Sequence, residues 1–260
     1  MRKFMDIILR VSSRMIRAAR FFLRAFVIGI AFLSIIPVKK FPDWDRDNLR
    51  YFCAVIPVVG IVIGIFWGIA FFALSYFGSY SGNFRGILMA IFTLGFTGGV
   101  HMDGLIDTSD AIFSHRDLSR RLEILSDSHV GAFGVISCVV ILMLKAGIFA
   151  EIFLRDSGFL RVMIVPVLSR LGAAYLLNNL EFAKSDGLAK ILGSARVRGD
   201  NIFLGIFALV LGICDWRIFF VFVLVLVFWR RVCVRKFCGI TGDLIGAFIE
   251  ISEVVMLFCI

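Results

Sequence analysis

The longest stretch without a charged residue sets the strongest limit on how this chain can fold. Residues 51–84 contain no Asp, Glu, Lys or Arg. A helix needs about 20 predominantly apolar residues to cross the hydrocarbon core of a bilayer, so we expect a first membrane span at about 52–78. The whole chain agrees, because 60% of its 260 residues are hydrophobic and only 18% are charged, against about half and about a quarter in soluble domains.

Further apolar runs follow the first, and some are shorter than a full span. They fall near 87–102, 129–153, 160–180, 201–214, 217–229 and 244–260. We therefore expect an all-α, polytopic helical bundle of about seven spans, forming one integral membrane domain over residues 1–260. The 29 Phe and 24 Gly suit helices that meet lipid through bulky side chains and each other through small ones, whereas a β-barrel would alternate polar and apolar positions.

The beginning of the chain has a basic amphipathic pattern. Seven Lys or Arg residues alternate with apolar ones over 2–24, which is typical of a helix that lies in the lipid headgroup plane. We expect no cleaved signal peptide here, because the apolar stretch 25–38 leads into Lys39 and Lys40 and not to a small-residue cleavage site. That stretch is short for a span, so we interpret it as a re-entrant or interfacial segment.

Basic residues gather on one side of this layout. With the N-terminus inside, 22 of the 28 Lys and Arg residues fall in inner segments and four in outer loops. This asymmetry follows the positive-inside rule, so we expect a multi-pass membrane protein whose N-terminus lies on the cytoplasmic side. The net charge of +9 suits anionic lipid headgroups and anionic substrates. We expect no nucleic acid partner, and an oligomer is left open.

Three acids stand where an apolar run meets the inner surface. At about 100° per residue, Asp103, Asp107 and Asp110 share one narrow helix face. Carboxylates so arranged repel one another unless they are solvated, protonated or neutralised by a cation, and oxygen ligands of this kind suit Mg²⁺ or Mn²⁺. The alternative is a helix end whose charged face points into water. We take the three acids as the catalytic, metal-binding face, because ionisable residues beside a span are usually functional.

Two further groups of polar residues are candidates for substrate binding. Arg side chains suit phosphate oxygens, and the loop after the acids contains Arg116, Arg120, Arg121 and Asp127. By itself this loop would also fit a solvated surface helix. In the last apolar run, Asp243 and Glu250 share one helix face. They either contribute to the site, as we expect, or form an internal pair with Lys145 or with Arg170, which we also include among the substrate-binding candidates.

The acidic run and several other blocks resemble one protein family. The central block is His101-Met102-Asp103-Gly104-Leu105-Ile106-Asp107-Thr108-Ser109-Asp110, and the others lie, in the order of that family, at 32–38, 56–60, 121–128, 169–170, 186–188 and 239–247. Together they closely resemble the cobalamin synthase family, the adenosylcobinamide-GDP ribazoletransferases. The chain departs from that family's pattern at Ile35 and Ser126, where a basic residue is common.

The resemblance implies a Mg²⁺-dependent enzyme of the inner membrane whose active site faces the cytoplasm. Such an enzyme joins adenosylcobinamide-GDP to α-ribazole, or to its 5′-phosphate, and releases GMP. The resemblance does not identify the residue that acts as the general base. Two other functions also fit parts of the pattern, namely a phospholipid-type alcohol phosphotransferase and a transporter that uses intramembrane acids. The position of the acids at the inner end of a span, beside an Arg-rich loop, favours the enzyme with a soluble phosphorylated substrate.

Overall fold

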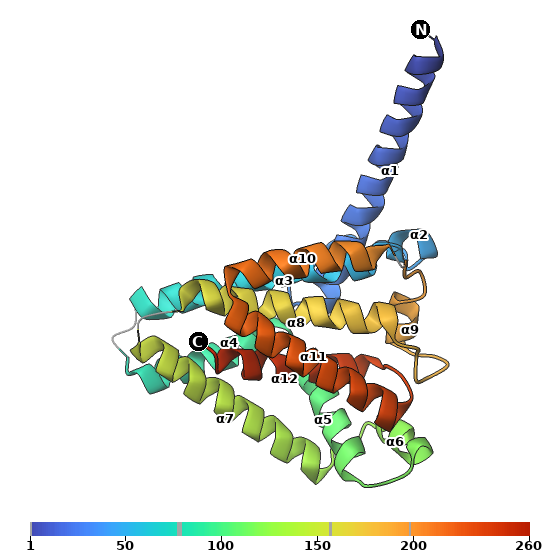
Figure 1. Cartoon of the computed structure of the whole chain (residues 1–260). Helices are drawn as coiled ribbons and strands as arrows, with labels where there is room; N and C mark the ends of the chain where they lie inside the picture. Colours follow the sequence, from blue (N-terminus) through green and yellow to red (C-terminus); the bar gives the residue numbers. More distant parts are fainter. Residues whose placement is uncertain (1, 77–79, 156–157, 198) are drawn as a thin grey trace.

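The computed structural model describes residues 2–76, 80–155, 158–197 and 199–260, and the regular elements in these ranges are helices (Figure 1). An isolated parallel bridge joins Phe182 to Ile240. The expected all-α class is therefore confirmed. The helices are α1 (Arg2–Leu33), α2 (Arg46–Leu49), α3 (Phe52–Tyr76), α4 (Gly82–Phe96), α5 (Val100–Phe113), α6 (Leu118–Ile124), α7 (Ala132–Leu154), α8 (Phe159–Asn179), α9 (Leu188–Leu192), α10 (Asp200–Cys214), α11 (Trp216–Phe237) and α12 (Gly242–Leu257).

Fewer helices than expected are long and apolar enough to cross a membrane. Within the described ranges, α3, α7 and α8 meet that requirement by length and composition, and α4 with α5 would add a fourth only as one broken span. The expected count of seven spans is not confirmed. The last apolar runs are the reason, because α10 has 15 residues and α12 has 16, and α11 carries Arg and Lys over its last two turns.

The N-terminal segments expected to be separate form one helix. The structure continues α1 without a break through residues 24 and 25 to Leu33, because no residue at that boundary interrupts helical geometry. Figure 1 shows the early part of α1 extending away from the other helices, while its last turns reach the body. There Ala25 and Ile28 are fully buried. The stretch 25–38 is thus the docked end of α1 followed by residues without regular secondary structure, and its re-entrant or interfacial position in a membrane stays a prediction.

Glycines allow the two central helices to touch at the backbone. Gly60, Gly64 and Gly68 repeat every four residues along the face of α3 that meets α8. A Cβ on Gly64 would lie 2.3 Å from the carbonyl oxygen of Met163 in α8. Small residues at this spacing are how apolar helices approach closely in a membrane protein. The contact of α3 with α8 therefore depends on glycine at these positions, because any larger residue would separate the two helices.

A break between α4 and α5 turns the chain toward the candidate site. Gly98 and Gly99 have φ values of +65° and +75°, a left-handed conformation that glycine adopts without steric cost, and the two helices meet at 91°. The first turns of α5 then cross α12 at close range. A Cβ on Gly104 would lie 2.7 Å from the Asp243 carbonyl oxygen, so the acids of α5 and the start of α12 are brought together.

We expect Gly64→Ala to destabilise the fold. The added methyl group has to separate α3 from α8, and overpacking of this kind costs about 1–3 kcal/mol. Gly147→Ala is the matched control, because Gly147 in α7 has open space around its Cβ position and Ala favours helix more than Gly. Thermal unfolding in one detergent should show a lower midpoint for the first variant only. Equal midpoints would contradict the close α3–α8 contact.

Candidate active site

A cavity of about 340 Å³ lies where α5, α8, α9 and α12 meet the ends of α1 and α3. Its inner wall is apolar and includes Phe32, Phe52 and Leu177. Its polar lining is His101, Asp103, Ser126, Lys184, Asp186, Lys190, Thr241 and Asp243. A concave site with an apolar wall and a few converging polar groups is the usual form of a binding site for small molecules, so we take this cavity as the candidate active site.

Carboxylates from two helices lie in this cavity and beside it, with Asp103 and Asp243 in its lining. Asp103 and Asp107 stand one turn apart on α5, and Asp243 is in the first turn of α12. The negative charges of Asp103 and Asp243 both act on Asp107, and the Lys184 ammonium opposes them. Thr241 fixes the start of α12, because its hydroxyl accepts the N–H of Leu244 at 3.2 Å and donates to Asp243 at 3.3 Å. The sequence predicted a contribution of Asp243 to the site but not its position beside the acids of α5.

Asp110 has a different set of contacts from the other two acids of α5. Its carboxylate oxygens accept the backbone N–H groups of Gly131 at 2.8 Å and Gly134 at 2.9 Å. These groups belong to the start of α7, where the helix dipole favours a negative charge. A Cβ on Gly131 would lie 2.4 Å from Asp110 Oδ1, so this contact requires glycine there. Asp110 therefore attaches α7 to α5.

The structure does not arrange the side chains of Asp103, Asp107 and Asp110 as three ligands of one metal ion. In the described part of the chain, no group of three His, Cys, Asp or Glu side chains is arranged to hold a metal ion. The shared helix face is present, since all three residues lie on α5. The amide groups of α7 bind both oxygens of Asp110, an interaction between distant segments that a helical projection cannot reveal, and metal binding by the three acids together stays a prediction.

Lys184 is a cavity residue that sequence reasoning missed. Its Nζ donates to the Leu125 carbonyl at 3.0 Å and to Ser126 Oγ at 2.8 Å. The segment before it is held beside the start of α12, because Ala183 N–H donates to the Ile240 carbonyl at 3.0 Å. A single lysine in a polar connection carries no motif of its own. The signal that could have found it is the block at 186–188, two residues farther along the chain.

The expected arginine cluster lies on the loop beside the cavity and has other partners. Arg120 pairs with Glu123 at 2.6 Å, and both side chains are about 60% exposed. Asp127 is bound by His129 at 2.7 Å, and this hydrogen bond holds the pKa of the Asp127 carboxyl below its usual value. Arg116 is exposed. The contacts thus match a solvated surface helix, and a role of Arg116, Arg120 and Asp127 in substrate binding stays a prediction.

Arg121 is more restrained than its neighbours. Its Nε donates to the Arg116 carbonyl at 2.8 Å, and its Nη1 donates to the carbonyl of Lys236 at the end of α11. The guanidinium also lies 6.0 Å from the centre of the Phe237 ring. These contacts connect the loop after α5 to α11, so they give Arg121 a structural function. Its proposed contact with substrate stays a prediction.

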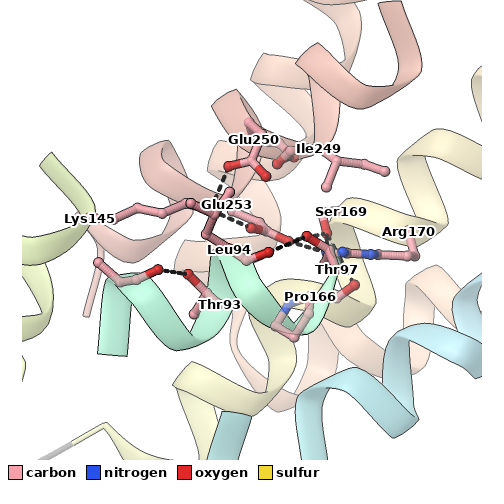
Figure 2. A network of polar contacts seen from close by, with 12 residues as sticks. Thr93, Leu94, Thr97, Lys145, Pro166, Ser169, Arg170, Ile249, Glu250 and Glu253 are labelled. Atoms are coloured by element: carbon pink, nitrogen blue, oxygen red, sulfur yellow. Dashed lines mark hydrogen bonds and ion pairs between the residues drawn. The ribbon is translucent and has the colours of Figure 1, made fainter. Parts of the chain in front are cut away.

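Arg170 and Glu250 belong to a buried ion-pair network (Figure 2). Lys145 Nζ donates to Glu250 Oε2 at 2.6 Å and to Glu253 Oε2 at 2.9 Å. Arg170 pairs with Glu253 and donates to Ser169 Oγ at 2.9 Å. All four charged side chains are at most 3% exposed. For Glu250, the structure therefore shows the internal pairing with Lys145 that the sequence left open. Arg170 and Glu250 are not among the residues that line the cavity.

Two comparisons with known proteins identify the same family. The family model for cobalamin-5-phosphate synthase matches residues 25–260. A protein of Geobacillus sp. (strain WCH70) named adenosylcobinamide-GDP ribazoletransferase is 33% identical over 241 residues, which cover 86% of this chain and 90% of the relative. A protein of the same name from Clostridium botulinum (strain 657 / Type Ba4) is 31% identical, covering 90% and 96%. No solved structure matches significantly.

We expect Lys145→Met to destabilise the protein strongly. The substitution leaves Glu250 buried without its partner, and breaking a buried ion pair costs about 3–5 kcal/mol. The double variant Lys145→Met with Glu250→Gln should recover part of this loss, since it removes the stranded charge. Arg120→Met is the control, because an exposed pair contributes about 0–1 kcal/mol. The midpoint of thermal unfolding measures all three, and an unchanged midpoint for Lys145→Met would contradict the structural function of the network.

Proposed function

Since the chain belongs to the cobalamin-5-phosphate synthase family, we propose that the cavity between α5 and α12 is the active site in which it performs the transfer of that family. The chain is a ribazoletransferase of cobalamin biosynthesis. It joins adenosylcobinamide-GDP to α-ribazole and completes the nucleotide loop. The observation that carries our assignment of the site is the grouping of Asp103, Asp243 and Lys184 in the lining of one cavity, with Asp107 one turn from Asp103 on α5.

The reaction sets clear requirements for such a site. A ribose hydroxyl of α-ribazole attacks the phosphorus attached to cobinamide, a new P–O bond forms, and the bond to the leaving GMP breaks. The hydroxyl proton passes to a base or to water. Enzymes accelerate phosphoryl chemistry mainly by positioning the reactants and neutralising charge on the phosphates. Carboxylates alone would repel the pyrophosphate of the substrate, so the site needs cations.

The donor set fits Mg²⁺ when substrate is present. Mg²⁺ is usually bound by one or two carboxylates together with water and substrate phosphates, so it does not need three protein ligands. We propose that Asp103 and Asp107 hold the ion and that Asp243 binds it directly or through water. When bound, Mg²⁺ neutralises charge on the phosphates. Asp110 then has a structural function, because its hydrogen bonds with the backbone N–H groups of Gly131 and Gly134 fix the position of α5 against α7.

Lys184 is one of two lysines that line this cavity, with Lys190. Its ammonium group lies against Ser126 Oγ, the position at which the resembled family commonly has a basic residue. We propose that Lys184 supplies this charge from the segment before α9 and binds a phosphate oxygen of adenosylcobinamide-GDP. Its two partners, a carbonyl and a hydroxyl, are uncharged, so the ammonium group can exchange one of them for a phosphate oxygen.

The membrane position follows from charge. We propose that the cavity faces the cytoplasm of a bacterial inner membrane, because the segments around it belong to the basic side of the chain. The exposed Arg14 and Arg17 of α1, beside the exposed Met15 and Ile16, support binding of this helix to a surface of anionic lipid. A cytoplasmic opening would admit the soluble substrate and release GMP.

Purified protein in detergent should release GMP from adenosylcobinamide-GDP only when α-ribazole and Mg²⁺ are both supplied. Asp107→Asn keeps the side-chain shape but removes a charge and a ligand. A cation that neutralises transferring phosphates contributes several kcal/mol, so we expect turnover to fall about a hundredfold or more. Asp47→Asn, in the exposed first turn of α2, is the control. Near-normal turnover and an unchanged Mg²⁺ dependence in Asp107→Asn would refute the proposed metal site.

Lys184→Met should raise KM for adenosylcobinamide-GDP about ten- to hundredfold, because a hydrogen bond to a charged group contributes about 1.5–3 kcal/mol. Lys184→Arg should recover part of the loss. Ser126→Ala separates binding from structure, since it removes a partner of the lysine but leaves the charge. If Ser126→Ala reproduced the defect of Lys184→Met in KM and stability, Lys184 would be a structural residue and the proposed phosphate contact would be wrong.

A further inference from the structure

A second concave surface lies on the side of α5 away from the cavity. It is a groove of about 550 Å³ between α5 and α11. Apolar side chains form its walls, among them Leu105, Ile112 and Phe113 from α5 and Phe228 and Val232 from α11. Phe113 and Phe228 are 47% and 62% exposed, so the groove is bordered by exposed apolar groups. We call it the α5–α11 groove.

Positive charges border one end of this groove. Arg231, Arg235 and Lys236 all line it, and all three are exposed. They belong to the last two turns of α11, where the helix dipole also favours positive charge. Arg121 adds a fourth cation nearby, because it is bonded to the carbonyl of Lys236. The α5–α11 groove thus combines an apolar channel with a cationic end.

This combination matches the chemistry of one class of ligand. An anionic phospholipid has apolar chains at one end and a negatively charged phosphate at the other. Each Lys or Arg close to an anionic headgroup contributes about 1 kcal/mol to binding. We propose that the α5–α11 groove binds an anionic phospholipid, with an acyl chain along the apolar walls and the phosphate among Arg231, Arg235 and Lys236.

Two other possible occupants of the groove, a second copy of the chain and free phosphate, match it less well. In a symmetric dimer within one membrane, two copies of this face would bring both sets of α11 cations to the same depth, and like charges repel. The net charge of +9 on each chain adds to that repulsion. Free phosphate would satisfy the cations but would leave the apolar walls exposed. A phospholipid satisfies both parts of the groove.

Occupation of the groove would join α11 to the helix that carries the catalytic acids. Leu105 and Ile112 face the groove, while Asp103 lines the cavity. A lipid bound between α5 and α11 therefore stabilises α5 from the side opposite the proposed active site. This binding site does not depend on the proposed reaction, and its test needs no turnover.

Trp229 lines the groove and provides a local probe. The full chain, in a neutral detergent, is titrated with phosphatidylglycerol or phosphatidylcholine carrying brominated acyl chains, which quench nearby tryptophan. The part of the quenching that Trp229→Phe removes reports the groove. We expect this part to reach half-saturation at an about tenfold lower mole fraction of phosphatidylglycerol than of phosphatidylcholine. Equal quenching by the two lipids would overturn the proposal.

The triple variant Arg231→Gln, Arg235→Gln and Lys236→Gln should lose this preference, so that the about tenfold difference between the two lipids falls to about one. Two variants serve as controls. The triple variant Lys39→Gln, Lys40→Gln and Arg46→Gln removes as many exposed charges elsewhere and should keep the preference, as should Arg231→Lys with Arg235→Lys, which keeps the charge. An unchanged preference in the α11 triple variant would overturn the proposal.

Two further outcomes distinguish the other occupants. If inorganic phosphate raised the unfolding midpoint of the natural chain but not of the α11 triple variant, and neither lipid quenched Trp229, the groove would be a site for free phosphate. If neither lipid quenched Trp229 and Phe228→Cys formed crosslinks between two chains, the groove would be an interface between copies. Either result would replace the phospholipid as the occupant.

Discussion

The close crossing of α5 over α12 is the contact on which the candidate site depends. Gly104 and Gly246 remove the side chains that would otherwise separate these helices, since a Cβ on Gly246 would lie 3.0 Å from the His101 carbonyl oxygen. At this separation Asp243 comes into the electrostatic range of Asp107. A wider crossing would disperse the acids, and the cavity would lose the charge density that attracts a divalent cation.

The buried ion pairs stabilise the same crossing from the other end of α12. Lys145 of α7 and Arg170 of α8 both bind Glu253, so three helices are connected at one residue of α12. Separating these charges would leave them unpaired in an apolar interior, which is costly. The pairs therefore specify how α12 is oriented against α7 and α8, and they do so without offering a charge to the cavity.

Different residues of α5 have different contacts and different proposed functions. Asp103 lines the cavity, Asp110 holds the first amides of α7, and Leu105 faces the groove beside α11. One short helix thus has a proposed catalytic surface, a structural attachment and a proposed lipid contact. Because a helix repeats every 3.6 residues, neighbouring positions of one motif can serve all three purposes.

The sequence by itself determined the all-α membrane class, the family and the helix that carries the acids, because hydropathy and helical periodicity are local properties. Only the tertiary structure decided the partners of those residues. Asp110 attaches to α7, Glu250 pairs with Lys145, and Lys184 reaches the cavity. Each of these results depends on which distant segments become neighbours. Helix crossing angles and close glycine contacts set that choice, and a one-dimensional pattern does not contain them.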